Sequence, residues 1–227
     1  MGKGMALMAR SKKPVLAALA LMLAACGSDP SEAPLATVLL SAAKTAVSPK
    51  AQPAAAMAIT RAQIAATGGI PLIRLGVPSR DVVVYITRRD TNSGTESWAT
   101  GDNTVVTLRN GVLISTRGLT PDLMSAAAPT VSQLANSGGS HARSYFVLGD
   151  NDTNDRLEFT CKMASLGSQR LEVIERVYAT THMQETCTGD AGKIVNDFWI
   201  EGGGFIRQSH QWTNPKIGYI DIAKLVE

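Results

Sequence analysis

Apolar and polar residues alternate at every second position through most of the chain beyond Asp81. Successive side chains of a β-strand point to opposite faces, so this period predicts strands with one buried side. The expected strands are 82–87, 104–108, 112–115, 144–148, 156–163, 171–186, 195–200, 205–212 and 217–222. Strand follows strand with short turns and without alternating helices. The pattern therefore predicts an all-β fold, an antiparallel β-barrel or a strongly curved sheet.

Turn and capping residues divide this pattern. Asn110-Gly111 separates two expected strands and is a strong hairpin signal. Residues 60–63, Thr-Arg-Ala-Gln, form a capping-box pattern that opens a short helix before the sheet, and Gly68-Gly69 would close it. Residues 125–142 are rich in Ala, Ser and Gly and are expected to form a loop. Gly167 marks the expected centre of the hairpin between residues 156–163 and 171–186.

The N-terminal residues have a different pattern. Four basic residues precede an apolar run, which ends in Leu-Ala-Ala followed by Cys26. This order predicts a lipoprotein signal peptide at residues 1–25 and acylation of Cys26, with an ordinary signal peptide as the alternative. The lipid would anchor the protein to a membrane. Because Asp29 does not directly follow Cys26, we expect the outer membrane, with the domain facing the periplasm.

The remaining chain divides into two parts. Residues 26–58 are rich in Ala, Pro and Ser and are expected to be a flexible, lipidated tether. Residues 59–227 would form a single β-rich domain. Cleavage would leave 18 of the 22 basic residues against 19 acidic ones, a net charge near −1. That balance argues against a nucleic-acid partner.

Two further cysteines are left in a compartment that favours disulfides. The period of two places both Cys161 and Cys187 on the inward side of their strands, with Glu175 and Glu185 as polar exceptions beside Cys187. A hairpin centred at Gly167 would set Cys161 opposite residue 174. A disulfide then requires a bulge, a bend or a contact across the barrel. Two buried free thiols are the alternative.

The sequence shows little catalytic chemistry. None of His141, His182 and His210 has a second ligand at metal-binding spacing, and no nucleophile elbow is present. The spacing of Asp150, Asp152 and Asn154 resembles the start of a calcium loop, but the later positions do not fit, and a solvated turn is favoured. We therefore expect no metal, no cofactor and no catalytic residues.

Three residues are candidates for contact with a partner or a glycan: Trp98, Arg207 and Trp212. Large aromatic side chains can stack on sugars, although in a small β-domain they more often belong to the core or its rim. Arg207 is either an inward member of a salt bridge or a contact residue.

The C-terminal hairpin resembles a known family. Asn-Asp-Phe-Trp-Ile at 196–200, the later Ile-Arg-Gln-Ser-x-Gln-Trp at 206–212 and Gly-Tyr at 218–219 are similar to the YjbF/GfcB lipoproteins of group 4 capsule and exopolysaccharide systems. Residues 97–102, Gly111 and residues 116–123 add a second match. The resemblance implies an outer-membrane lipoprotein with a β-barrel-like domain and no established catalytic residues.

The leading expectation is thus a non-enzymatic accessory protein for assembly or export of exopolysaccharide or capsule. Its partners would be polysaccharide or other proteins of the export system. One alternative is a periplasmic carrier that holds a lipid or a glycan-lipid in a barrel cavity. A large open apolar cavity would favour the carrier. An interior filled by side chains would favour the accessory protein, which would act by docking a partner on its surface. A polysaccharide-processing enzyme is a third, less favoured alternative.

Overall fold

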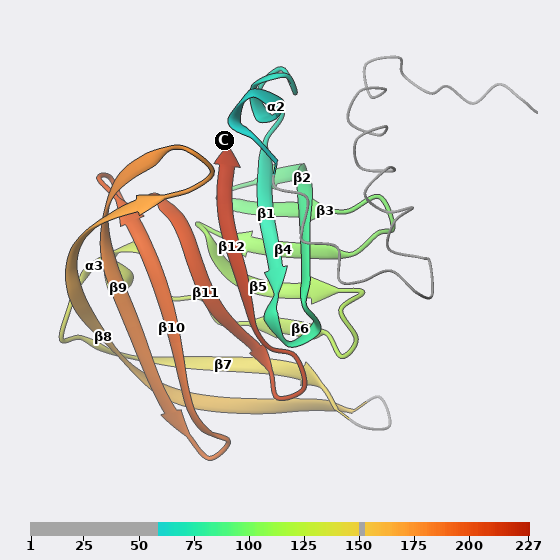
Figure 1. Ribbon diagram of the computed structural model, residues 1–227. Helices are drawn as coiled ribbons and strands as arrows, with labels where there is room; N and C mark the ends of the chain where they lie inside the picture. Colours follow the sequence, from blue (N-terminus) through green and yellow to red (C-terminus); the bar gives the residue numbers. More distant parts are fainter. Residues whose placement is uncertain (1–58, 150–152) are drawn as a thin grey trace, which may run out of the picture.

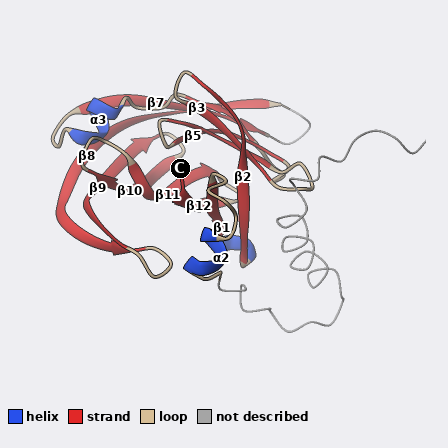
Figure 2. Cartoon of the chain, turned by 90° about the horizontal axis from the view of Figure 1, so that it is seen from above, coloured by secondary structure: helices blue, strands red, loops and turns tan. Residues whose placement is uncertain are grey.

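The computed structural model describes residues 59–149 and 153–227. These residues form one antiparallel sheet of 12 strands, in the order β5-β4-β3-β2-β1-β12-β11-β10-β9-β8-β7-β6. The sheet curls into a nearly closed barrel, as Figures 1 and 2 show. The strands are β1 Leu72–Val77, β2 Val82–Asn92, β3 Thr95–Ala99, β4 Val105–Arg109, β5 Val112–Arg117, β6 Leu123–Ala126, β7 Ser140–Leu148, β8 Asn154–Glu172, β9 Val177–Gly189, β10 Gly192–Glu201, β11 Ile206–Asn214 and β12 Gly218–Val226. The expected all-β class is confirmed.

The two outermost strands of the sheet approach each other through side-chain contacts. Thr116 of β5 accepts a hydrogen bond from the backbone N–H of Leu123 in β6 at 2.9 Å. The same hydroxyl donates to Asp122 at 3.0 Å. This threonine therefore satisfies backbone and side-chain groups at the seam, where the ladder of β-sheet hydrogen bonds is interrupted.

Several local predictions agree with the structure. Asn110 and Gly111 have φ values of 49° and 83° and join β4 to β5. Two positive φ values are what the two-residue hairpin turn favoured by this dipeptide requires. Helix α2 (Arg61–Ala65) begins at Thr60 with the complete capping box, in which Thr60 and Gln63 bond each other's backbone N–H. A 3₁₀ turn, η2 (Pro78–Arg80), joins β1 to β2.

Several expectations were wrong in detail. Residues 125–142 are not simply a loop, because they include the end of β6, helix α3 (Val131–Ala135) and the start of β7. The strand expected at 171–186 begins only at Val177, and the last strand is longer than expected. The β8–β9 turn is centred on Ile174 and Glu175, which have positive φ values, whereas Gly167 lies within β8 at a bulge. Strands β1, β3 and β6 had no expected counterpart.

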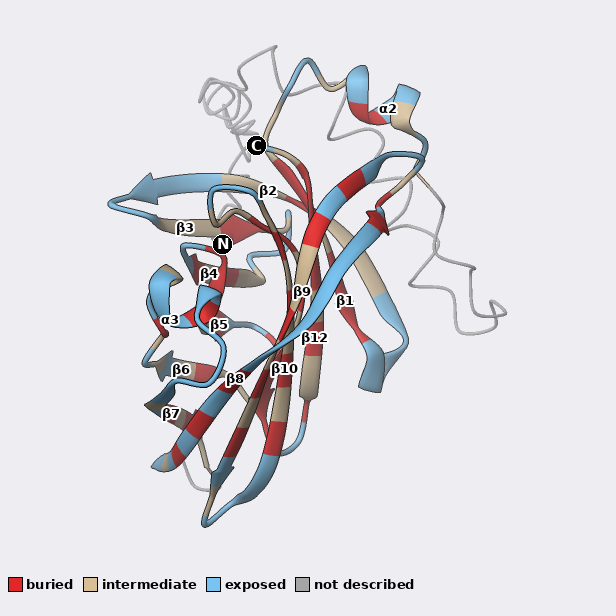
Figure 3. Cartoon of the chain, turned by 90° about the vertical axis from the view of Figure 1, so that its left-hand side faces the viewer, coloured by how far each residue is buried: buried red, intermediate tan, exposed pale blue. Residues whose placement is uncertain are grey.

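Side chains from all around the sheet fill the interior. The main cluster joins Trp98 of β3, Tyr145 of β7, Phe159 of β8 and Trp212 of β11, among others. The rings of Tyr145 and Trp212 meet edge to face at a centroid distance of 4.9 Å. A second cluster lies where Ile64 of α2 packs with Leu72 and Leu225. Figure 3 shows the buried residues alternating with exposed ones along the long strands.

Candidate functional site

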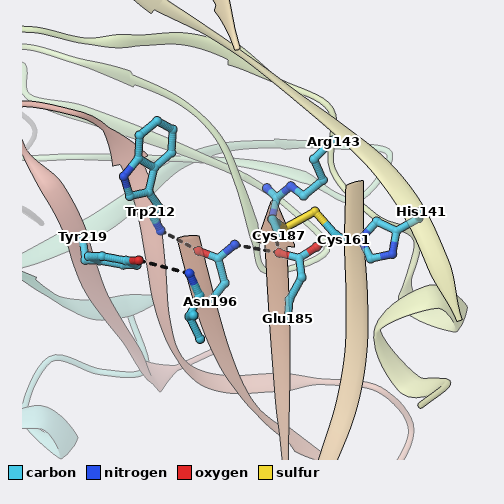
Figure 4. Close-up of a disulfide and its surroundings, with 9 residues drawn as sticks. His141, Arg143, Cys161, Glu185, Cys187, Asn196, Trp212 and Tyr219 are labelled. Carbon is cyan, nitrogen blue, oxygen red and sulfur yellow. Dashed lines mark hydrogen bonds and ion pairs between the residues drawn. A yellow bond between two sulfur atoms is a disulfide. The ribbon is translucent and has the colours of Figure 1, made fainter. Parts of the chain in front are cut away.

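Glu185 of β9 lies at the centre of a buried polar cluster (Figure 4). Its side chain is fully buried and is bonded to two groups from β7 and one from β10. Arg143 of β7 donates to Oε2 at 2.6 Å, Asn196 of β10 donates to the same oxygen at 2.6 Å, and His141 Nε2 lies 2.6 Å from Oε1. The acid that breaks the apolar pattern of β9 is thus the hub of an interior network.

Opposing influences act on the pKa of Glu185. Burial alone raises it, but the Arg143 charge and the bonds from His141 and Asn196 outweigh this effect, so the pKa is lowered below its ordinary value of 4.5. The carboxylate stays ionised and paired with Arg143. A buried charge of this kind is tolerated because a counter-charge and hydrogen bonds replace the lost water.

The disulfide between Cys161 and Cys187 lies beside this cluster. The two residues are direct register partners on β8 and β9, and Cys161 also faces His141 on β7. Neither a bend nor a contact across the barrel is needed, because the turn lies nearer to residue 174 than to Gly167. The bulge in β8 falls between the cysteines and that turn.

The same cluster contains groups of types that bind metals. One donor atom each of His141, Cys161 and Glu185 lies within 4.8 Å of the others. The Cys161 sulfur is committed to the disulfide, and both oxygens of Glu185 already accept hydrogen bonds. A zinc site usually needs four ligands, commonly with free thiolates. The residues present in this oxidised state do not fit a metal.

Asn196 of β10 connects the Glu185 cluster to strand β11. Its carbonyl oxygen accepts from the backbone N–H of Trp212 at 2.7 Å, beyond the last paired residues of β10 and β11. The hydroxyl of Tyr219 accepts from the backbone N–H of Val195 at 3.1 Å. Side chains thus replace the missing ladder bonds where the strands separate, and the Trp212 ring lies in the core.

Arg207 is the centre of a second ionic cluster. It is ion-paired with Glu201 and with Glu227, the latter at 2.5 Å, and it donates to the carbonyl of Lys224 at 3.0 Å. Its guanidinium lies 4.1 Å from the centroid of the Tyr178 ring. Burial lowers the pKa of Arg207, but the two glutamates more than compensate and raise it above its ordinary value.

The three residues considered for partner contact therefore lie inside. Trp98 is 0% exposed, Arg207 5% and Trp212 7%. A surface partner cannot reach them in this structure, and the contact hypothesis is not supported. Arg207 is the inward salt-bridge member, and the two tryptophans are core residues. Of the other sequence candidates, Cys26, Asp150 and Asp152 lie outside the described residues.

The outer side of β9–β12 presents a different set of side chains. On β10, Asp197 and Trp199 alternate with residues buried inside; on β12, Tyr219 and Asp221 do the same. His182 of β9 is bonded to Asp197 at 2.7 Å, and its ring stacks on Trp199 with a centroid distance of 4.6 Å. We call six residues the His–Asp face: His182, Asp197, Trp199, His210, Tyr219 and Asp221.

The second half of the His–Asp face repeats the first with other residues. His210 of β11 is bonded to Asp221 at 2.7 Å and stacks on Tyr219 at a centroid distance of 4.4 Å. The side chains of His182 and Asp197 are 19% and 18% exposed, and those of His210 and Asp221 are 35% and 40% exposed. These partly exposed groups are held in fixed positions on rigid strands.

Sequence reasoning missed the His–Asp face. The metal-site patterns considered there involve ligands close in sequence. The partner of His182 is 15 residues away and that of His210 is 11 residues away, each on an adjacent strand. The available signal was the alternation within residues 196–200. Asp197 and Trp199 fall at the alternate positions, so their side chains lie on the side of the strand that faces away from the core. Each histidine also precedes the strand on which its partners lie.

Comparisons with known proteins agree with this architecture. The family model described as "Group 4 capsule polysaccharide lipoprotein gfcB, YjbF" matches residues 35–225. The crystal structure of the hypothetical lipoprotein YmcC from Escherichia coli K12 is similar with a TM-score of 0.67 and 18% identity, covering 75% of this chain and 90% of that one. That likeness shows a shared fold.

A more distant structure is that of a putative exported protein of Bacteroides fragilis described as having a YmcC-like fold. Its TM-score is 0.36 and its identity 12%, covering 69% of this chain and 93% of that one. No curated protein matches the chain. The family model covers well over half of the sequence, including the hairpin motifs and the His–Asp face. The chain therefore belongs to the YjbF family of group 4 capsule polysaccharide lipoproteins.

Proposed function

We propose that this protein is a non-enzymatic accessory lipoprotein of the outer membrane that acts in assembly or export of exopolysaccharide or capsule. The observation that carries the proposal is the match of the capsule polysaccharide lipoprotein family to residues 35–225. The domain would face the periplasm and present a rigid surface to polysaccharide or to proteins of the export system.

The arrangement of ionisable groups supports a role in binding. Among the described residues, all three histidines are bonded to carboxylates, and none is hydrogen-bonded to a serine, threonine or cysteine. Both carboxylate oxygens of the interior acid Glu185 already accept hydrogen bonds. A hydrolase of the serine type needs a nucleophile within hydrogen-bond reach of a base. These groups build the sheet and its surface instead.

The anchor is part of the same proposal. Residues 1–25 would be removed as a signal peptide, Cys26 would receive the lipid, and residues 26–58 would link it to the domain at 59–227. In the portion that the structure describes, no helix has the length and apolar character needed to cross a membrane. A lipid on Cys26 would attach the protein to the membrane and so hold the domain near the export system.

Deletion of the gene tests the proposal directly. We expect less polysaccharide on the cell surface or in the medium, with restoration by a plasmid copy of the full chain. Assays of sugar released from purified polysaccharide by the purified protein provide the second arm. Unchanged polysaccharide in the deletion strain, or steady release of sugar by the protein, would contradict the accessory role.

A carrier function is the second candidate, and one depression favours it. A hollow of about 500 Å³ lies beside the curled end of β8 and β9, with Met183 and Ile200 among its lining residues. The main core of the barrel is filled by side chains, which favours the accessory protein that binds its partners on its surface. Native mass spectrometry of the purified protein distinguishes the two, because a carrier would retain a co-purifying lipid that Ala179→Trp, a change in the lining of the hollow, would displace.

A further inference from the structure

The His–Asp face combines the two kinds of group that sugars require. A pyranose ring presents C–H groups on its face, which pack on aromatic rings, and hydroxyls at its rim, which donate to carboxylates. Trp199 and Tyr219 supply aromatic rings, and Asp197 and Asp221 supply the acceptors. We propose that the His–Asp face is a binding surface for a neutral saccharide chain. This inference rests on the proposed function and names the surface that would contact the polysaccharide.

The carboxylates have capacity left for a ligand. In each one the Oδ1 atom accepts from its histidine, and Asp197 Oδ1 also accepts from Gln184 at 3.1 Å. Within residues 59–149 and 153–227, the Oδ2 atoms of these two carboxylates have no hydrogen-bond partner. An ionised carboxylate can accept several hydrogen bonds, and such charge-assisted bonds are the stronger kind. The face therefore offers two free acceptors to hydroxyl donors.

The charge of the surface argues for a neutral partner. The face carries the carboxylates of Asp197 and Asp221. A polyanion would be repelled by Asp197 and Asp221, whereas the hydroxyls of a neutral sugar are matched to them. This complementarity selects a hydroxyl-rich chain over a nucleic acid or an acidic peptide.

The local fold leaves room beside one of these acids. Gly76 of β1 faces Asp221 in the ladder, and a Cβ atom at Gly76 would lie 3.3 Å from the Cβ of Asp221. A larger residue would crowd the carboxylate. On the other side, His182 faces Gly167 of β8, where a Cβ atom would meet open space. Glycine thus adjoins both ends of the face.

The separation of the two aromatic rings points to a chain of sugars. Trp199 and Tyr219 lie two strands apart, and Trp199 aligns through Gln208 with Ala223, four residues beyond Tyr219. With about 4.8 Å between strands and about 3.3 Å per residue, the two Cα positions are roughly 16 Å apart. One sugar ring cannot contact both, so the ligand is an oligosaccharide segment.

The side chains are also fixed before binding. Trp199 Nε1 donates to Gln169 at 2.8 Å, and the Tyr219 hydroxyl is bonded to the backbone of Val195. Stacked rings and paired carboxylates lose little rotamer freedom when a ligand arrives. Pre-organisation of this kind raises affinity because less conformational freedom is lost on binding.

Tryptophan fluorescence tests the proposal in the full processed chain, purified in detergent. Trp98 and Trp212 are buried and Trp199 is partly exposed, so a ligand on the face should alter the Trp199 signal alone. The probe is polysaccharide purified from the surface of the organism that carries the gene. We expect a saturable change in emission that disappears in Trp199→Phe.

Matched variants then measure affinity by co-sedimentation with the same polysaccharide. Asp197→Ala and Asp221→Ala should each weaken binding by at least about fivefold, as for truncation of an important contact residue. Glu158→Ala is the control, because Glu158 is an exposed, ion-paired acid on β8. Asp197→Asn, which keeps the side-chain shape, should weaken binding less than Asp197→Ala, and thermal melting checks that each variant is folded.

The outcomes separate the two proposals. Loss of binding in the aspartate variants with an intact control supports the saccharide surface. Wild-type affinity in both folded aspartate variants, or no binding of the probe by the wild-type chain, overturns it. If gene deletion still lowers polysaccharide output in that case, the accessory function stands and only the surface is wrong. If deletion has no effect either, both proposals fail.

Discussion

Cys161 and Cys187 are direct partners across the ladder of β8 and β9, and their bond joins the two longest strands of the sheet next to the buried Glu185 cluster. The pairing follows from the position of the β8–β9 turn at Ile174 and Glu175. The hairpin arm between the cysteines and that turn curves round toward helix α2 in Figure 2, and Arg61 of α2 donates to the carbonyls of Val173 and Ile174 in the turn. The disulfide therefore fixes the point from which this arm extends.

The first prediction concerns the disulfide. Cys161 and Cys187 are 26 residues apart, and a cross-link closing a loop of this length stabilises a chain by about 3–4 kcal/mol in the chain-entropy model. The double variant Cys161→Ala/Cys187→Ala should lose about that much free energy of unfolding in urea. Thiol counting on the denatured, unreduced wild-type protein is the control. Two free thiols, or equal urea midpoints, would contradict the prediction.

The second prediction concerns Glu185 and Arg143. Glu185→Ala leaves the Arg143 guanidinium buried without its counter-charge, and breaking a buried pair in this way costs about 3–5 kcal/mol. Chemical unfolding should show that loss. Glu158→Ala, which removes an exposed acid from an ion pair, should change the free energy of unfolding by less than about 1 kcal/mol. Equal effects of the two variants would show that the cluster is not essential to the fold.

The third prediction is a pH dependence. The pKa of Glu185 in the folded protein is below 4.5, so near that pH the unfolded chain binds a proton more readily than the folded one. The stability from this group is complete above pH 4.5 and is lost as the pH falls toward the folded pKa. Melting temperatures measured between pH 3 and pH 7 should fall on the acid side, and the fall should be smaller in Glu185→Gln. Parallel curves for the two proteins would contradict this assignment.

The fourth prediction concerns Arg207. Its planar guanidinium bonds two glutamates and a carbonyl while it stacks on Tyr178, and a lysine cannot reproduce that geometry. Arg207→Lys should therefore be destabilised by about 1–3 kcal/mol although the charge is kept. Arg170→Lys, at an exposed position of β8, is the control. A wild-type melting temperature for Arg207→Lys would show that charge alone suffices.

The fifth prediction concerns Cys26, which lies outside the described residues. Acyl chains contribute about 0.8 kcal/mol for each buried CH₂, so a multi-chain lipid holds a protein firmly to a membrane. Cys26→Ala should release the protein from the outer-membrane fraction or leave its signal peptide uncleaved. Fractionation and mass spectrometry of the mature N-terminus decide the matter, and normal processing with normal membrane association would exclude acylation at Cys26.

Features determined by residues close together in the sequence were predicted correctly, and features determined by residues far apart in the sequence were not. The Asn110-Gly111 turn and the Thr60 capping box were predicted correctly, because a few adjacent residues determine each one. The β8–β9 turn was placed at Gly167 because glycine is the usual turn residue, yet Ile174 and Glu175 adopt positive φ values there. Pairing along the arm and its bulge decide that position, and local preference does not reveal them.

The interior network shows the same limit. Glu185 was visible as a polar exception in an apolar row, but its partners Arg143 and His141 lie 42 and 44 residues away in the sequence. Trp98 and Trp212 were considered for contact because tryptophan serves both cores and sugar sites. Only the closing of the sheet decides between these roles, and it places both rings inside.

The attachment of α2 determines how the domain would resist a pull on its N-terminal side. Arg61 donates to the carbonyls of Val173 and Ile174 in the β8–β9 turn and of Leu225 in β12. The chain then enters β1, which lies between β2 and β12 in the interior of the sheet order. An edge strand can be peeled off one hydrogen bond at a time, whereas β1 can leave only by breaking two ladders. Tension applied ahead of α2 would thus load a strand that is held on both sides, rather than an edge of the sheet.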